Sequence, residues 1–390
     1  MISPEAALEQ LRLGTARIVS EEELLAKLRA GRPLTVKLGV DPTAPDIHLG
    51  HTVGLQKLRQ FQDLGHNAVL IIGDFTAMIG DPSGRSVTRP HLSHDEVMAN
   101  AKSYQEQAFK ILDPERTKIR FNGEWFEIMT FEEVIRLNSR VTLQQMLQRE
   151  DFRARIDEGH PIHAHEIQYP IMQGWDSVKI RADVEIGGTD QLFNILVGRD
   201  LQKEEGQPQQ VALMVPILEG LDGVQKMSKS LNNYVAVNEA PREMFGKLMS
   251  IPDALMERYY LLLLGEPVPG GHPMDAKKEL GRRIVERYHD AAAARDALED
   301  FNTRFSRRDL EHADLPFVDL AGSGLDLVGA VVKAYADGFG ATRSRGDVRR
   351  LIEQGSVQWR GEKASDLKAV LPFASGEVLR LDKKHQVRVR

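Results

Sequence analysis

The sequence contains no cysteine among its 390 residues. A disulfide framework, a thiolate zinc site and a cysteine nucleophile are therefore excluded. No apolar run approaches the roughly 20 residues that a membrane-spanning helix requires, and the opening segment MISPEAALEQLRLGTAR lacks the apolar core of a secretory signal. We therefore expect no membrane partner and a cytoplasmic location.

An excess of charge of one sign is also missing, because the net charge of the chain is only −6. Taken alone, this value argues against a nucleic-acid partner, but the charge is unevenly distributed. Residues 343–390 hold 12 Lys and Arg against 6 Asp and Glu, a net charge of +6, which leaves −12 for the rest. A basic C-terminal segment on an acidic body suits RNA binding, although a solvated basic surface gives the same count.

Apolar runs rich in β-branched residues alternate with segments of helical period from the N-terminus to about Ser230. This alternation is typical of a parallel sheet wrapped by helices. We expect the strands to be Leu34–Val40, Ala68–Gly73, Thr117–Phe121, Val184–Ile186 and Val211–Val215. We expect the helices to be about Gly50–Leu64, Ser93–Ile111, Phe131–Leu147, His165–Val178 and Gln191–Lys203.

Strand signals disappear from Pro241 to about Phe305, where helical period dominates, as in Ala276–Ala294. Further helices are expected at Leu325–Ala336 and Arg345–Gln354, followed by β-like runs at 357–360, 378–381 and 387–389. The sequence therefore predicts three domains. They are a doubly wound α/β domain of the Rossmann type at 1–236, a helical domain at 237–325, and a linker helix with a small α+β domain at 326–390.

Two histidines open the helix that follows the first predicted strand, in the motif His48-Leu49-Gly50-His51. At positions i and i+3 the two imidazoles lie on one helix face, beside the backbone amides of a helix N-terminus, which favour anions. Gly50 would let a base or a ribose approach the backbone closely. The motif suits phosphate chemistry, although a metal pair or two surface residues are compatible with the same spacing.

A second motif, Lys226-Met227-Ser228-Lys229-Ser230, stands in a Gly- and Asp-containing loop far along the chain. Two lysines and two hydroxyls in a mobile loop can close on a triphosphate and neutralise charge on a departing pyrophosphate. An ordinary surface loop of Lys and Ser would look similar. No Walker-type phosphate loop competes with the two motifs, because residues 80–86 have the wrong spacing and an Arg in place of the Lys.

Tyr169, Gln173 and Asp176 stand at positions i, i+4 and i+7, so the three side chains project from one face of the predicted helix. A phenol, an amide and a carboxylate that converge in this way can bond an ammonium group at one end of a ligand and a hydroxyl at the other. The solvated face of a helix gives the same spacing. The residues alone leave both interpretations open.

The combination of His48-Leu49-Gly50-His51 with Lys226–Ser230 resembles the two signature motifs of class I aminoacyl-tRNA synthetases, HIGH and KMSKS. With the segments 73–85, 169–176 and 186–191, the chain resembles bacterial tyrosyl-tRNA synthetases over essentially its whole length. The resemblance implies ATP with Mg²⁺, L-tyrosine and tRNA(Tyr) as substrates, a homodimer, and no tightly bound metal or organic cofactor.

The resemblance also implies a role for each matching position. The tyrosine ammonium would be held by Asp81, Tyr169 and Gln173, the tyrosine hydroxyl by Asp176, and the reacting carboxylate would lie beside Gln191. ATP would be bound by Asp41, Thr43, His48, Gly50, His51, Gly188, Asp190, Lys226, Ser228, Lys229 and Ser230. Charge on the pyrophosphate would be stabilised by the catalytic set His48, His51, Lys226, Lys229, Arg85 and Arg89.

The sequence departs from many relatives at the tyrosine pocket. Lys37 stands where a tyrosine that helps to read the substrate hydroxyl is common, and Trp175 replaces a tyrosine beside Asp176. We therefore expect Asp176 to be the hydroxyl reader, and Lys37 to be either a reshaped edge of the pocket or the partner of an acidic neighbour.

Residues 343–390 resemble a small RNA-binding domain first described in a ribosomal small-subunit protein, which implies contacts with tRNA phosphates. Two rival functions share these features. They are a tryptophanyl-tRNA synthetase of the same fold and a noncatalytic RNA-binding homologue. A metal cluster at His160, His163 and His165 is set aside, because the three residues precede a helix in a chain whose chemistry is already explained.

Overall fold

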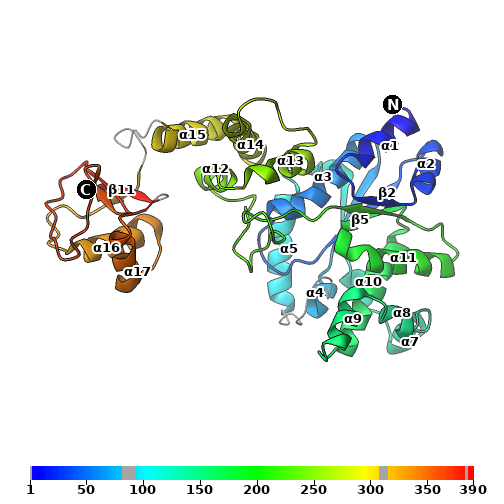
Figure 1. Ribbon diagram of the computed structural model, residues 1–390. Coiled ribbons are helices and arrows are strands. Elements are labelled where there is room, and N and C mark those ends of the chain that lie inside the picture. Colours follow the sequence, from blue (N-terminus) through cyan, green and yellow to red (C-terminus); the bar gives the residue numbers. More distant parts are fainter. Residues whose placement is uncertain (1, 81–92, 307–314, 383–384) are drawn as a thin grey trace. The chain divides into compact units, whose positions relative to one another are not determined.

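The computed structural model describes residues 2–80, 93–306, 315–382 and 385–390 (Figure 1). The chain forms two compact units, 1–294 and 295–390. The domain boundaries expected at 236/237 and 325/326 stay predictions. In the described part of the chain, no helix combines the length and the apolarity needed to cross a bilayer.

The first unit is built on a six-stranded sheet with the strand order β1-β6-β5-β2-β3-β4. The strands are β1 Arg17–Val19, β2 Thr35–Val40, β3 Asn67–Ile72, β4 Thr117–Phe121, β5 Val184–Gly188 and β6 Val211–Val215. Strands β2 to β6 run parallel to their neighbours, whereas β1 pairs antiparallel with β6. The predicted α/β fold with its five parallel strands is confirmed, and β1 is an edge strand that the sequence analysis missed.

Strand order reverses between β2 and β5. The chain passes from β2 to β3 and β4 on one side and then returns to β5 on the other side of β2. In open α/β sheets, ligands bind outside the carboxyl ends of the strands at such a switch point. The fold therefore places the functional site beyond Val40 and Gly188, where β2 and β5 end.

Helices cover the sheet and extend beyond it (Figure 1). In the first unit they are α1 Pro4–Arg12, α2 Glu21–Arg29, α3 Leu49–Asp63, α4 Thr76–Ile79, α5 His94–Ala108, α6 Gly123–Phe126, α7 Phe131–Asn138, α8 Leu143–Met146, α9 Glu150–Asp157, α10 Ala164–Ile180, α11 Leu192–Glu204, α12 Pro241–Met249, α13 Met256–Tyr259 and α14 Pro273–Tyr288. Helix α15, Ala291–Phe301, spans the division between the two units.

Two expected helices are each divided in two. The helix expected over 131–147 is α7 and α8, because Thr142 has an extended backbone and its side chain accepts a hydrogen bond from the Gln145 amide, which starts a new helix. The helix expected over 276–294 ends at Tyr288, because His289 adopts φ −125° and ψ −104°, outside the helical region.

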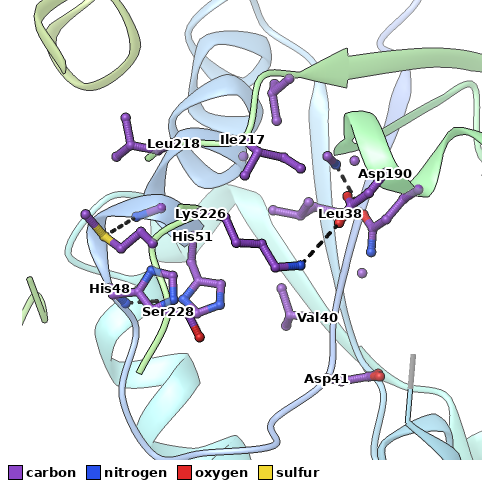
Figure 2. A pocket seen from close by; sticks show the side chains of 18 of the residues that line it. Leu38, Val40, Asp41, His48, His51, Asp190, Ile217, Leu218, Lys226 and Ser228 are labelled. Atoms are coloured by element: carbon purple, nitrogen blue, oxygen red, sulfur yellow. Dashed lines mark hydrogen bonds and ion pairs between the residues drawn. The ribbon is translucent and has the colours of Figure 1, made fainter. Parts of the chain in front are cut away.

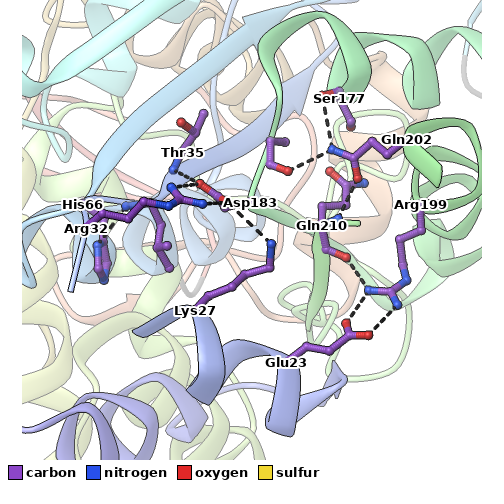
Figure 3. Close-up of polar contacts among 12 residues, drawn as sticks. Glu23, Lys27, Arg32, Thr35, His66, Ser177, Asp183, Arg199, Gln202 and Gln210 are labelled. Atoms are coloured by element: carbon purple, nitrogen blue, oxygen red, sulfur yellow. Dashed lines mark hydrogen bonds and ion pairs between the residues drawn. The ribbon is translucent and has the colours of Figure 1, made fainter. Parts of the chain in front are cut away.

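Polar contacts gather near the amino ends of the strands (Figure 3). Asp183, just before β5, accepts hydrogen bonds from Arg32 (2.8 Å) and from the Thr35 amide (2.9 Å). Arg199 on α11 bonds Glu23 on α2 at 2.7 Å. These ties join the segment before β2 to the start of β5, and α2 to α11.

The second unit has a core of its own. Its five-stranded sheet has the order β7-β11-β10-β8-β9. The strands are β7 Phe317–Val318, β8 Gln358–Trp359, β9 Glu362–Lys363, β10 Val378–Arg380 and β11 Gln386–Val389, and the helices are α16 Leu327–Phe339 and α17 Arg345–Glu353. Fully buried side chains from both layers, among them Tyr335, Val348, Leu379 and Val387, pack together. The unit is a small α+β fold.

Candidate active site

A cavity of about 300 Å³ opens where β2 and β5 end, at the switch point of the sheet (Figure 2). Its walls come from the loop after β2, the start of α3, the β5–α11 turn, the segment after β6 and the loop of the second motif. Eleven predicted site residues line it: Asp41, Thr43, His48, Gly50, His51, Tyr169, Gly188, Asp190, Gln191, Lys226 and Ser228. Segments far apart in the sequence therefore meet at one cavity.

His48 and His51 form a stacked pair at the start of α3. Their ring centroids lie 3.7 Å apart, and Nδ1 of His51 accepts a hydrogen bond from the His48 amide at 3.2 Å. Burial, together with the nearby His51 and Lys229, lowers the pKa of His48 to about 2. The imidazole of His48 is therefore neutral at physiological pH, and it can act on a phosphate as a hydrogen-bond donor but not as a cation.

The two motifs touch each other directly. The Gly50 amide donates to the sulfur of Met227 at 3.3 Å, and the Leu49 amide donates to the Val235 carbonyl at 2.9 Å. A Cβ atom on Gly50 would lie only 3.0 Å from the His48 ring and 3.4 Å from Met227, so a side chain there would crowd both neighbours. The start of α3 and the loop of the second motif thus form one continuous wall of the cavity.

The lysines of the second motif reach toward two carboxylates. Nζ of Lys226 lies 3.9 Å from Asp190, across the cavity (Figure 2). Nζ of Lys229 lies 3.9 Å from Asp46. Burial lowers the pKa of Lys229, an effect that Asp46 opposes. Lys226 and Ser228 line the cavity, whereas Lys229 and Ser230 stand outside its wall.

A chain of hydrogen bonds runs from the cavity into the interior. The Tyr169 hydroxyl donates to Asp41 at 2.8 Å, the Thr76 hydroxyl donates to Asp41 at 2.9 Å, and Nδ2 of Asn122 donates to Thr76 at 3.0 Å. A Cβ atom on Gly73 would come within 2.1 Å of Asp41, so only glycine fits beside this chain. The chain fixes the orientation of the Tyr169 ring on the cavity wall.

Asp176 lies at the inner end of this chain. Its carboxylate accepts hydrogen bonds from Nε1 of Trp125 at 3.0 Å and from Nδ2 of Asn122 at 3.4 Å. Burial raises the pKa of Asp176 to about 7, and Glu185 adds to the rise, while Lys37 and the two donors oppose it. The carboxyl group therefore changes charge near physiological pH.

Lys37, Gln173 and Asp176 lie behind the cavity wall and do not line it. All three are buried in the layer between α10 and the sheet. Asp81, Arg85 and Arg89 lie outside the described residues. The substrate contacts predicted for these six residues stay predictions.

Sequence reasoning missed the partners of the predicted residues. Asn122 and Trp125 are separated from Asp176 by more than 50 positions, and no periodicity links them. Glu185 did carry a signal, because a charged residue inside the apolar run of a buried strand requires a partner. Lys37 carries the same signal in the neighbouring strand, and the two residues are direct partners in the register of β2 and β5.

Of the three histidines set aside as metal ligands, His163 is the N-cap residue of α10. His163 precedes the first turn of α10, and its amide donates to Glu166 at 2.9 Å. Among the residues that the structure describes, no group of three or more His, Asp and Glu side chains is placed to hold a metal ion. The absence of a resident metal stays a prediction.

The model of the family "tRNA synthetases class I (W and Y)" matches residues 29–306 of the chain. The match defines the class of the protein as the class I tRNA synthetases for tryptophan and tyrosine. Among curated relatives, the tyrosine-tRNA ligase of Moorella thermoacetica is 51% identical over 97% of this chain and 94% of its own length. That of Aquifex aeolicus is 49% identical over 100% of this chain and 99% of its own length. The chain therefore belongs to the bacterial tyrosyl-tRNA synthetase family.

Solved structures share the fold. The tyrosyl-tRNA synthetase of Archaeoglobus fulgidus, complexed with L-tyrosine, matches 76% of this chain and 99% of its own at a TM-score of 0.61 and 22% identity. The C-terminally truncated mitochondrial enzyme of Aspergillus nidulans matches 78% of this chain and 95% of its own at a TM-score of 0.65 and 22% identity. At these identities the likeness shows the fold alone.

Proposed function

We propose that the chain activates L-tyrosine with ATP and transfers the tyrosyl group to tRNA(Tyr). The observation that carries the proposal is the single cavity at which the two motifs meet, with Tyr169 on its wall and Asp176 behind it. In the first step, the tyrosine carboxylate attacks the α-phosphate of ATP in line, the bond to the β-phosphate breaks, and pyrophosphate leaves, which gives tyrosyl-adenylate. In the second step, a hydroxyl of the terminal ribose of the tRNA attacks the tyrosyl carbonyl carbon, and AMP leaves.

The nucleotide would occupy the part of the cavity between α3 and the β5–α11 turn. Asp190 would bind the ribose, and Gly188 would let the sugar lie against the backbone. His48 and His51 would donate hydrogen bonds to phosphate oxygens, and Lys226 would leave Asp190 to meet the triphosphate. ATP would enter with Mg²⁺ as part of the substrate, with Asp41, Thr43, Gly50, Ser228, Lys229 and Ser230 around it.

Tyrosine would lie with its ammonium toward Tyr169 and Gln173, its carboxylate toward Gln191, and its hydroxyl toward Asp176. Discrimination against phenylalanine then follows from an unpaired group. A buried carboxylate that loses its hydroxyl partner costs about 1–3 kcal/mol or more. By the resemblance, Asp81 would also hold the ammonium, and Arg85 and Arg89 would reach toward the pyrophosphate.

We infer a homodimer from an exposed apolar surface on the first unit. Ile128, Phe131, Ile135 and Leu143 are 80%, 78%, 55% and 59% exposed, and all four lie between the end of α6 and the start of α8. Apolar side chains gathered in this way mark an interface more often than a free surface. We call this group the α7 surface.

The basic segment 343–390 is proposed to bind tRNA phosphates, while the helices of 237–325 face the anticodon side. Arg343, Arg345, Arg349 and Arg350 cluster at the start and on the exposed side of α17. Such contacts position an RNA without reading its bases. The cytoplasmic location expected from the sequence stays a prediction.

Pyrophosphate exchange tests the proposal. The purified protein, ATP and labelled pyrophosphate are incubated with tyrosine, with tryptophan or with neither. We expect label to enter ATP with tyrosine only. Exchange with tryptophan only would establish the rival tryptophan enzyme. RNA binding without exchange for either amino acid would establish the noncatalytic homologue.

A further inference from the structure

A lysine and a glutamate are paired in the middle of the sheet, beneath the proposed tyrosine site. Nζ of Lys37 on β2 lies 2.9 Å from Oε1 of Glu185 on β5, and the exposed fractions of the two side chains are 0% and 1%. The desolvation cost of burying an ion pair can exceed the attraction between the two charges, so the pair is weak evidence for stability. Its position calls for another explanation.

Each proton of the Lys37 ammonium has a partner. Besides Glu185, Nζ donates to the Gln173 carbonyl at 2.7 Å and to the Ser177 hydroxyl at 2.9 Å. The last two partners stand on α10 and enclose the turn that carries Asp176. Lys37 has no proton left for a substrate, and it ties one turn of α10 to β2.

Glu185 holds the same turn from β5. Its carboxylate accepts hydrogen bonds from Nε2 of Gln173 at 3.1 Å and from the Ser177 hydroxyl at 2.8 Å. A further bond comes from the side-chain amide of Gln210. Oε1 of Gln173 in turn accepts from Asn194 at 2.9 Å. Both ends of the Gln173 amide are therefore fixed by neighbours.

Three charged groups share this interior: Lys37, Glu185 and Asp176. With all three ionised, the cluster has a net charge of −1. On the side that faces α6, Asp176 accepts hydrogen bonds only from neutral donors, Asn122 and Trp125, among the described residues. The charges that act on it are the attraction of Lys37 from β2 and the repulsion of Glu185 from β5. The charge of Asp176 thus depends on the balance within the pair.

This inference rests on the proposed function. We propose that Lys37 and Glu185 are positioning residues for tyrosine recognition, which hold the turn of α10 from Gln173 to Ser177 in place and keep Asp176 able to meet the phenol as a carboxylate. An ionised Asp176 accepts the phenol proton in a charge-assisted hydrogen bond, which is stronger than a bond between neutral groups. Neither member of the pair touches the substrate.

The pair determines how tyrosine binding depends on pH. Because the pKa of Asp176 is about 7, the KM for tyrosine falls as pH rises through this range. Lys37→Met removes the attraction of the ammonium for the Asp176 anion, so the midpoint of the fall in the tyrosine KM moves to higher pH. Glu185→Gln removes the repulsion, so the midpoint moves to lower pH. In the double variant the two effects oppose each other, and the midpoint returns toward that of the wild type.

The experiment measures KM for tyrosine and for ATP by pyrophosphate exchange between about pH 6 and 8.5. The proteins are the wild type, Lys37→Met, Glu185→Gln and the double variant. We expect Lys37→Met to raise the tyrosine KM at pH 7 about fivefold, because a rise of the Asp176 pKa by about one lowers its ionised fraction from about one half to about one tenth. The ATP KM should change little. The double variant should recover part of this loss.

Lys57→Met is the matched control. Lys57 on α3 is also buried, and its ammonium donates to the carbonyls of Leu11 (2.9 Å) and Leu13 (2.7 Å), away from the cluster. Its loss lowers stability without moving the pH profile of the tyrosine KM. If Lys37→Met behaves like this control, the proposal is wrong.

A variant that fails to fold does not end the test. Should Lys37→Met be insoluble, Glu185→Gln and the double variant remain, and an unchanged midpoint in both rejects the positioning role. The failure of the proposed function looks different. In that case the wild type itself shows no tyrosine-dependent exchange, whereas failure of this inference alone leaves the exchange of the wild type intact.

Discussion

Asp176 combines burial with a charge that no described residue neutralises by direct contact. Trp125 and Asn122 supply two neutral donors, and the nearby ammonium of Lys37 donates its protons to other partners. Without a ligand, burial therefore favours the protonated carboxyl group over the anion. A phenol hydroxyl adds a third donor and favours the ionised form. The residue that we propose to recognise tyrosine therefore destabilises the empty enzyme when it is ionised.

This property predicts how the free energy of unfolding changes with pH. The pKa of Asp176 is about 7 in the folded protein, against 3.8 for an unperturbed aspartate, so the folded state binds more protons between these values. The protonated Asp176 therefore stabilises the folded state fully below pH 3.8, and this stabilisation is lost as pH rises through about 7. Asp176→Asn removes the titration. We expect the stability of the variant relative to the wild type to rise by a few kcal/mol between about pH 4 and 8.

Denaturant unfolding at a series of pH values, without tyrosine, measures this difference. The test is how the difference in unfolding free energy between variant and wild type changes with pH. Its size at a single pH is not informative, because asparagine also alters the hydrogen bonds with Asn122 and Trp125. A difference that stays constant across the range would show that Asp176 does not titrate there.

At the scale of the residue, spacing and motif were enough to predict much of the site. His48, His51 and Lys226 could be named because each motif is local in the sequence. Asn122 and Glu185 could not be assigned partners, because hydrogen bonds across strands and between layers depend on a register that periodicity does not specify.

At the scale of the element, strands were easier to predict than helix ends. The bounds of β2 to β6 differ from the expected ranges by at most two residues. Strands β3 and β6 were the easiest to place, because buried parallel strands form continuous apolar runs. Strand β1 has three half-exposed or exposed residues, and it is recognisable only from its pairing with β6. Helices α1, α2 and α9 were missed, since short amphipathic segments rich in charge do not differ enough from exposed loops.

The α7 surface predicts the oligomeric state. Ile135→Asp places a charge at the centre of this surface, where it would be buried without a partner in a dimer. We expect the wild type to sediment as a dimer. The dissociation constant of the dimer should be at least about tenfold higher in the variant. Val370→Asp, a change at an exposed valine of the second unit, is the control and should leave the dimer intact.

Sedimentation velocity at several protein concentrations distinguishes these cases. A monomeric wild type would remove the basis for the proposed interface. A dimer that is equally strong in the variant would place the interface elsewhere on the chain.

At the scale of the whole molecule, charge is divided along the chain. Residues 343–390 carry +6, whereas the preceding residues carry −12. The acidic part would repel the tRNA backbone, so binding depends on the basic segment and weakens as salt screens it. The second unit has its own core, so it can present this segment without support from the catalytic sheet.

Salt dependence tests this division. Arg349 and Arg350 are exposed on α17, and their replacement by alanine should weaken tRNA binding. It should also reduce the slope of log K against log salt by about one for each phosphate that the variant no longer neutralises. Arg29→Ala, at an exposed arginine on α2, is the control. Filter binding of labelled tRNA between about 50 and 200 mM salt gives the slopes, and equal slopes for all three proteins would reject a role for α17.

The stretch that bears the two lysines of the second motif is anchored on either side. An isolated β-bridge joins Lys226 to Glu219, and another joins Ala236 to His48. Between these anchor points only a short, fixed length of backbone can rearrange when a nucleotide arrives and leaves. Adding or removing a residue there would change how far each ammonium can travel, while point substitutions would not. Length, more than composition, is what this part of the polypeptide must preserve.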